Sequence, residues 1–333
     1  MIVDAHSHFV PPALLAILEN DGSNCGVELQ TDARSEKRVV FETGMALRPF
    51  FPELMDINLH LEEMDKNGIH FRALSPWLDL SGYWLPPDKG ERLCAVQNDA
   101  LAEALEPLSD RFAGLACVPL QDGVSAAREL TRAMEKLGLR GAMIGSHVNE
   151  ANLDEPELDP FWEAAEALQA FILLHPFQFF TGKRLSRYYM HNVIGNPYET
   201  TVAGASLIFG GVLARHPRLR VCLSHAGGFL PYQIGRLVRA FEALPVAREQ
   251  LDRSPDSFLS QFYYDSIAFD AMSLSFLIHR VGAERVLLGS DFPFGMGDPQ
   301  YHSRLEAVEG LKQTEREAVM GGTAAQLMHL DKL

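Results

Sequence analysis

Short apolar runs alternate with longer amphipathic segments along the whole chain. Apolar runs of about four to eight residues are typical of buried strands, and periodic segments of about ten or more residues are typical of helices. The pattern predicts eight strands, at residues 2–6, 71–77, 112–119, 141–147, 171–176, 220–226, 262–267 and 285–291. It predicts helices at residues 53–67, 88–108, 122–137, 156–169, 197–214, 229–243, 270–281, 299–311 and 314–328. This alternation predicts an α/β fold, a (β/α)8 or TIM barrel, with residues 1–333 as one domain.

A long segment follows the first predicted strand. Residues 9–52 are too many for a simple loop before the first outer helix. Residues 25–29 and 38–43 alternate apolar and polar positions around a polar turn, which predicts a small β insertion over the barrel mouth. The alternative fold, an open doubly wound sheet, needs a glycine-rich phosphate loop after the first strand. Here that strand ends in His6-Ser7-His8-Phe9 instead.

Composition narrows the class of protein. The chain has 333 residues, of which 47% are hydrophobic, and this fraction excludes a disordered chain. Its net charge of −15 argues against nucleic acid or an anionic membrane surface as a partner. The four cysteines lie far apart with no Cys-x-x-Cys pair, which argues against a disulfide framework. With neither a signal-peptide pattern nor a membrane-length apolar run, we expect a cytoplasmic protein.

Histidines gather at the ends of predicted strands. His6 and His8 end the first strand, and residues two apart in a strand point to the same side. His175, His225 and Asp291 end the fifth, sixth and eighth strands. Barrel enzymes carry their chemistry at these C-terminal ends, and such nitrogen and oxygen ligands suit Zn²⁺ with one position open for water. A single strand-end histidine is more often structural, but this joint arrangement predicts a metal site.

Four motifs surround these residues. They are Asp4-Ala5-His6-Ser7-His8-Phe9, Leu174-His175-Pro176, Ser224-His225-Ala226-Gly227-Gly228 and Gly289-Ser290-Asp291-Phe292-Pro293-Phe294. Together they resemble the amidohydrolase superfamily and, more narrowly, its branch that contains 2-amino-3-carboxymuconate 6-semialdehyde decarboxylase. The resemblance extends over the chain and includes Arg48-Pro49 in the insertion and Gly235-Arg236 after the sixth strand.

The resemblance implies a mononuclear metal site. It implies one Zn²⁺ per chain, or another divalent metal such as Mn²⁺, held by His6, His8, His175 and Asp291. Binuclear members of the superfamily bridge two metals with a carboxylated lysine on the fourth strand, and residues 141–147 contain no lysine. Deaminase members carry a glutamate where this chain has Gly228, which argues against deamination.

The resemblance also implies a reaction, the non-oxidative decarboxylation of an unsaturated or aromatic carboxylic acid. His225 and Asp291 would be the catalytic residues. A bound metal lowers the pKa of its water to about 7, and His225, with an ordinary pKa of about 6.5, can exchange a proton near neutrality. In the related decarboxylases, a proton delivered to the carbon that bears the carboxylate allows CO₂ to leave without an organic cofactor.

Two arginines are implied to bind the carboxylate substrate. They are Arg48 and Arg236, and arginine suits carboxylates because its donors form a planar fork. In this branch the arginine that matches Arg236 crosses a dimer interface, so we expect a homodimer. Residues 177–191 depart from the branch in their aromatic residues, which leaves the substrate open.

Three alternatives remain open. The same site could hydrolyse a lactone, ester or amide, or hydrate a C=C bond, as hydratases of this branch do. A metal-binding protein without catalysis is the third, and a candidate base beside an open coordination position argues against it. Release of CO₂ distinguishes decarboxylation from net uptake of water.

Overall fold

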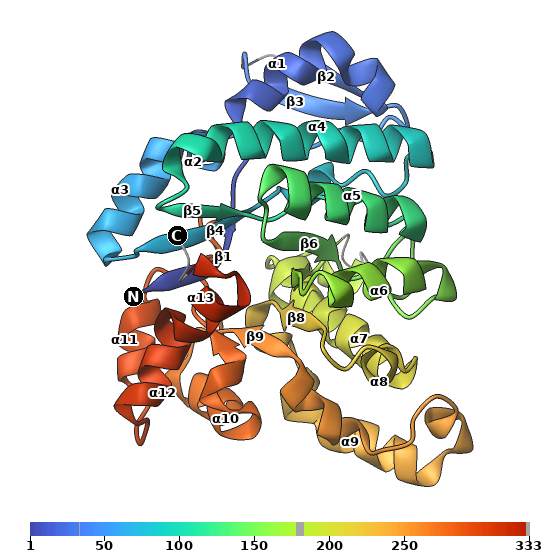
Figure 1. Cartoon of the computed structure of the whole chain (residues 1–333), viewed down its shortest axis with the longest axis vertical. Coiled ribbons are helices and arrows are strands. Elements are labelled where there is room, and N and C mark those ends of the chain that lie inside the picture. The colour runs from blue at the N-terminus through green and yellow to red at the C-terminus, as the bar shows by residue number, and fades with distance from the viewer. Residues whose placement is uncertain (33, 178–182, 331–333) are drawn as a thin grey trace.

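Eight parallel strands form the centre of the protein. The structure is a computed structural model that describes residues 1–32, 34–177 and 183–330 (Figure 1). The strands are β1 (Val3–His8), β4 (Phe71–Ser75), β5 (Phe112–Gly114), β6 (Gly141–Gly145), β7 (Phe171–His175), β8 (Arg220–Leu223), β9 (Tyr263–Asp265) and β10 (Val286–Leu287). Each predicted strand therefore has its counterpart in the structure.

The strands pair in chain order. One sheet has the order β1-β4-β5 and a second has the order β10-β9-β8-β7-β6. Backbone hydrogen bonds join the two sheets at both edges, since the Ala116 N–H donates to Gly141 O and the Ala5 N–H donates to Leu288 O, each at 2.8 Å. The fold class predicted from the sequence, a (β/α)8 architecture, is confirmed.

Several strands end earlier than predicted. Beyond β10 the chain turns, and Asp291 has a φ of +56°, a left-handed conformation that no strand accommodates. The backbone leaves regular pairing at His225 in the same way, with a φ of +53° after β8. Apolar runs fix where a strand begins, whereas these site residues fix where it stops.

Helices surround the strands. The main ones are α3 (Ile57–Asn67), α4 (Pro87–Leu105), α5 (Gly123–Leu137), α6 (Asp159–Ala167), α7 (Asn196–Phe209), α9 (Leu230–Ala243) and α10 (Ala271–Val281). The C-terminal helices are α11 (Tyr301–Glu306), α12 (Gln313–Glu317) and α13 (Thr323–Leu327). Among the helices described, none is both long and apolar enough to cross a membrane.

Three predicted helices are interrupted. The first is split into α2 (Pro52–Met55) and α3 because the Asp56 side chain caps α3 by accepting the Asn58 N–H. The fifth is split into α7 and α8 (Val212–Arg215) at Gly210-Gly211, where Gly211 has a φ of +73°. A π-helical turn at Ala318–Gly322 separates α12 from α13.

The insertion contains the predicted β hairpin and a helix that the sequence reading missed. Strands β2 (Val27–Thr31) and β3 (Lys37–Phe41) are antiparallel, and α1 (Pro12–Asp21) precedes them. Its apolar side chains, among them Leu14, Leu18 and Phe41, share a core with Leu93 of α4. Figure 1 shows α1, β2 and β3 lying along α4 at one end of the molecule. The position of residues 9–52 over the barrel mouth stays a prediction.

A buried ion-pair network ties the first strands to the loop that carries Asp291. Asp4 of β1 accepts a 2.9 Å hydrogen bond from Nε of Arg72 on β4, and both side chains are fully buried. Arg72 also pairs with Glu63 of α3. Asp4 also accepts hydrogen bonds from the backbone N–H of His6 at 3.3 Å and from the backbone N–H and the hydroxyl of Ser290 at 3.0 and 2.6 Å. The residue before Asp291 is therefore fixed to β1.

We predict that Arg72→Met lowers the free energy of unfolding by about 3–5 kcal/mol, because it leaves a buried carboxylate without its cation. Urea titration followed by circular dichroism measures the change. Arg128→Met is the control, since the pair of Arg128 with Glu91 is on the surface and is worth about 0–1 kcal/mol. Equal losses in the two variants would contradict the importance of this network.

Candidate metal centre

The structure brings the four predicted metal ligands together at the C-terminal ends of the strands. His6 and His8 project from β1 to the same side, His175 ends β7, and Asp291 follows β10. One possible ligand atom from each residue lies within 4.8 Å of the others. His6 and Asp291 are 285 residues apart in the chain, and the barrel brings them to one point.

The three histidines are oriented by hydrogen bonds on their far side. Nδ1 of His6 lies 2.7 Å from Oδ2 of Asp265. Nδ1 of His8 lies 3.2 Å from the carbonyl of Pro76, and Nδ1 of His175 lies 2.9 Å from that of Pro176. All three partners are acceptors, so each Nδ1 carries the hydrogen and each Nε2 presents a lone pair. Metal-ligating histidines show this arrangement.

The lone pairs face one another. Nε2 of His6 and Nε2 of His8 are 3.2 Å apart, and Oδ1 of Asp291 lies 3.0 Å from Nε2 of His8 and 3.4 Å from that of His6. With every Nδ1 protonated, these are acceptors packed against acceptors in a buried site. A divalent cation among them would remove the repulsion, so the donor set fits a metal.

The electrostatics of the cluster favour positive charge at its centre. Burial lowers the pKa of His175 well below its ordinary value, helped by the neighbouring histidines, and burial also lowers that of His8. Burial alone would raise the pKa of Asp291, but contacts with His225 and His8 hold it well below the usual range. For His6, the hydrogen bond to Asp265 and the charge of Asp291 outweigh burial and raise its pKa. The directions at His8, His175 and Asp291 favour neutral imidazoles beside a charged carboxylate, which is the form that binds a metal.

His225 lies beside the cluster. Its Nε2 is 3.5 Å from Oδ2 of Asp291, the carboxylate oxygen that faces away from His8. Its Nδ1 is buried and has no hydrogen-bond partner within the described chain. His225 and Ala226 both have left-handed backbones, with φ of +53° and +56°. Such non-glycine conformations cost about 1–3 kcal/mol each and gather at functional sites.

Asp265 is the site residue that sequence reasoning missed. It ends β9 and is fully buried, with its carboxylate directed at His6. The sequence contained a signal for it, because Asp265 is an aspartate inside the apolar run 262–267. It lies near the carboxyl end of a predicted barrel strand, where barrel enzymes carry their chemistry.

The two predicted substrate arginines lie in different places. Arg48 is exposed, and its guanidinium lies about 5 Å from the ring centres of Phe51, Trp77 and Phe294. The Phe294 ring is in turn 4.8 Å from that of His8, so Arg48 is near the metal cluster. Arg236 is exposed on α9 and does not line the cavity beside His225. Within the described residues it forms no ion pair.

A cavity of about 340 Å³ opens beside His225 and Asp291. Its walls come from the turn after β8 and from α7, α9 and α10, with Phe229, Ile267 and Phe269 among the apolar lining residues. A cavity that is mostly apolar and touches a few polar groups is typical of a small-molecule site.

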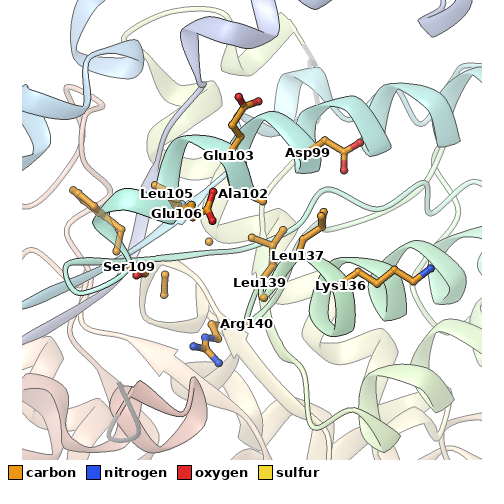
Figure 2. A pocket seen from close by; sticks show the side chains of 14 residues that line it. Asp99, Ala102, Glu103, Leu105, Glu106, Ser109, Lys136, Leu137, Leu139 and Arg140 are labelled. Atoms are coloured by element: carbon orange, nitrogen blue, oxygen red, sulfur yellow. The ribbon is translucent and has the colours of Figure 1, made fainter.

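A second cavity, of about 550 Å³, lies at the opposite ends of the strands, between α4 and α5 (Figure 2). Glu103, Lys136 and Arg140 are among its lining residues, and none of the predicted metal ligands is. The N-terminal end of a barrel contributes to stability and does not carry the active site. The candidate site is therefore the cluster around His6.

The sequence profile of the amidohydrolase family matches residues 3–330. The chain belongs to this family. The resemblance seen in the motifs is thus confirmed over the whole chain.

The relatives of this chain include decarboxylases. It is 32% identical over 330 residues to 2-amino-3-carboxymuconate-6-semialdehyde decarboxylase of Dictyostelium discoideum, covering 99% of this chain and 92% of that protein. It also superposes on the crystal structure of 5-carboxyvanillate decarboxylase from Sphingomonas paucimobilis with a TM-score of 0.81 and 25% identity, over 98% of each chain.

Metals are present in structures with the same fold. The dihydroxybenzoic acid decarboxylase from Polaromonas sp. JS666, crystallised with bound manganese, shares the fold with a TM-score of 0.79 at 23% identity. That alignment covers all of this chain and 98% of the other. Membership of the amidohydrolase family and the cluster of His6, His8, His175 and Asp291 support a divalent metal in this protein, whereas zinc as its identity is not established.

We predict that the purified protein binds about one divalent metal ion per chain, and that His175→Ala abolishes this binding because it removes a ligand. Inductively coupled plasma mass spectrometry on the dialysed protein gives the stoichiometry. His147→Ala is the matched control, because His147 follows β6, the strand next to β7, lies outside the cluster and should leave the metal in place. Two metals per chain, or unchanged binding in His175→Ala, would rule out this ligand set.

Proposed function

We propose that this protein is a metal-dependent, non-oxidative decarboxylase of an unsaturated or aromatic carboxylic acid. The observation that carries the proposal is the position of His225, a side chain capable of proton transfer, between the acceptor cluster and a cavity of about 340 Å³. The decarboxylase names of the relatives support the same reaction class.

The ligand set is part of this proposal. His6, His8, His175 and Asp291 would hold one cation, Zn²⁺ or another divalent metal such as Mn²⁺. When bound, the metal would supply concentrated positive charge that attracts and orients an anionic substrate. Asp291 would serve two roles, because Oδ1 faces His6 and His8 while Oδ2 faces His225.

His225 would act as the acid and base. Its Nε2 is the ring nitrogen nearer Asp291, and its ring lines the cavity, so a substrate carbon held there can exchange a proton with it. Protonation of the carbon that bears the carboxylate makes that carbon sp³. The C–C bond to the carboxylate then breaks, CO₂ leaves, and the electron pair returns to the conjugated system as the proton is retained.

Arg48 would bind the substrate carboxylate at the mouth. Its guanidinium is held against Phe51, Trp77 and Phe294. Because this packing already restricts the side chain, Arg48 would lose less conformational entropy when it binds a substrate. An arginine presents a fork of donors that matches a carboxylate.

The wide spacing of the cysteines and the lack of a membrane-length apolar run support the cytoplasm as the compartment of this protein.

A homodimer would complete the site. The exposed face of α9 and α10 carries Tyr232, whose ring stacks on that of Phe276 at 4.9 Å, and Met272, which is 81% exposed. Exposed apolar patches of this kind mark interaction surfaces. Arg236 lies four residues after Tyr232 and thus on the same helix face. A second copy covering this face would receive Arg236 near its own cavity.

Hydrolysis of a lactone, ester or amide and hydration of a C=C bond remain the competing reactions, since each can use the same metal and base. We predict that the metal-loaded protein releases CO₂ from a carboxylated muconate or a hydroxybenzoate in a substrate screen. Coupled detection of bicarbonate measures the release. Turnover of lactones or esters with no CO₂ from any carboxylate would reject decarboxylation.

We predict that His225→Ala retains most of its metal but loses turnover by roughly 10²- to 10⁴-fold, the contribution of a general acid or base. Metal analysis and steady-state kinetics on the same sample separate the two effects. His70→Ala provides the control, because His70 is exposed just before β4, at the opposite ends of the strands from the site, where it accepts the Ile2 N–H. Loss of the metal from a folded His225→Ala protein would instead make His225 a ligand.

Complementation tests the role of Arg236. We predict that His225→Ala and Arg236→Ala chains are each inactive alone and regain part of the activity when mixed. A mixed dimer has one pocket in which an intact His225 faces the intact Arg236 of the other chain. Native mass spectrometry verifies subunit exchange. If exchange occurs and activity stays absent, Arg236 does not serve the partner's pocket.

A further inference from the structure

Asp265 lies between the candidate metal ligand His6 and the turn that carries His225. It is fully buried at the end of β9, where it pairs in register with Leu287 of β10. Its Oδ2 accepts hydrogen bonds from Nδ1 of His6 at 2.7 Å and from the backbone N–H of His225 at 2.8 Å. Its Oδ1 accepts the N–H groups of Ala226 and Ile267 at 2.8 and 3.0 Å.

We propose that Asp265 is a positioning residue that sets the metal ligand His6 and the acid/base His225 in a fixed relation to each other. Asp265 is not among the residues that line the cavity beside His225. The first lining residue after β9 is Ile267. Its effect would pass through its two partners. The assignment of roles to those partners rests on the proposed function.

A single oxygen atom makes the connection. Because Oδ2 is shared, a shift of the carboxylate displaces the His6 ring and the His225 backbone together. The second oxygen secures Ala226, so both residues of the left-handed turn are bound by one side chain. Two such conformations cost about 1–3 kcal/mol each, and charge-assisted hydrogen bonds from the two N–H groups offset that cost.

Packing holds the carboxylate in place. Gly289, beyond β10, lies against both Asp265 and His6, and a Cβ atom added there would be 3.1 Å from the Cβ of each. The carboxylate accepts all four hydrogen bonds, two at each oxygen.

The amide of asparagine cannot replace this carboxylate. An asparagine has one acceptor oxygen and one NH₂ donor, so in any orientation its NH₂ would face two N–H groups. Asp265→Asn keeps the shape of the side chain but removes one of the two acceptor oxygens and the negative charge. It is therefore the informative substitution.

The first test measures metal affinity with Co²⁺ as the probe. Chelator competition is expected to show roughly 10- to 100-fold weaker Co²⁺ binding in Asp265→Asn, the usual effect of losing the partner of a ligating histidine. The visible Co²⁺ spectrum should change as well. Glu129→Gln is the control, since Glu129 is a buried carboxylate on α5 that pairs with Asn98 and Arg132. It should bind Co²⁺ with the affinity and spectrum of the parent.

The second test measures the coupling to His225. At saturating metal, Asp265→Asn is expected to lower kcat by roughly 10- to 100-fold. In a His225→Ala background the same substitution should lower kcat much less, because the residue that it positions is gone. Equal losses in the two backgrounds would show that Asp265 acts independently of His225 and would overturn the proposal.

Asp265→Glu keeps the charge and moves the carboxylate oxygens. If Asp265→Asn does not fold, this variant tests the positioning role instead. The proposal expects it to be impaired in both tests, and parental behaviour would overturn the proposal. Parental Co²⁺ affinity and spectrum in Asp265→Asn would also overturn the proposal. Failure of the proposed function is distinguishable, because a parent protein that binds Co²⁺ and releases no CO₂ rejects decarboxylation while the Co²⁺ measurements still test Asp265.

Discussion

Three imidazole nitrogens and a carboxylate oxygen, all acceptors, converge on one buried point of this protein. The convergence is imposed from outside, because acceptors on Asp265, Pro76 and Pro176 take the Nδ1 hydrogens and leave the Nε2 lone pairs facing inward. Such a cluster is electrostatically unfavourable unless a cation occupies its centre. The buried network of Asp4 and Arg72, which holds the loop before Asp291 to β1, keeps these groups from moving apart. The rigid barrel thus holds together four acceptor side chains that would otherwise repel one another.

The same rigidity accounts for the local strain. His225, Ala226 and Asp291 all have left-handed backbones at the ends of strands. Each is fixed by hydrogen bonds to a neighbouring strand, as the Asp291 N–H donates to the carbonyl of His6 at 2.8 Å. The strained turns direct the Nε2 of His225 at the far oxygen of Asp291, 3.5 Å away. A regular strand continuing through these residues could not place them so, and this is why the observed strands are shorter than the apolar runs.

The pattern of the sequence predicted the eight strands and a common site for His6, His8, His175 and Asp291, because apolar runs and strand-end positions are local signals. It missed α1, whose apolar positions pack on α4, a distant helix that only the folded chain supplies. It also missed Asp265, since a strand-end carboxylate gains its meaning from the hydrogen bond to His6, 259 residues away. The aromatic residues of 177–191 remain a sequence observation in part, because residues 178–182 lie outside those described.

X-ray absorption spectroscopy of the metal-loaded protein tests the central claim most directly, because it reports the ligand atoms around the metal. The account predicts a shell of nitrogen and oxygen atoms at about 2.0–2.2 Å for Zn²⁺. Outer-shell scattering should correspond to about three imidazoles, the number that His6, His8 and His175 provide. A sulfur shell at about 2.3 Å, or a second metal at about 3.5–4 Å, would contradict the mononuclear histidine and aspartate site.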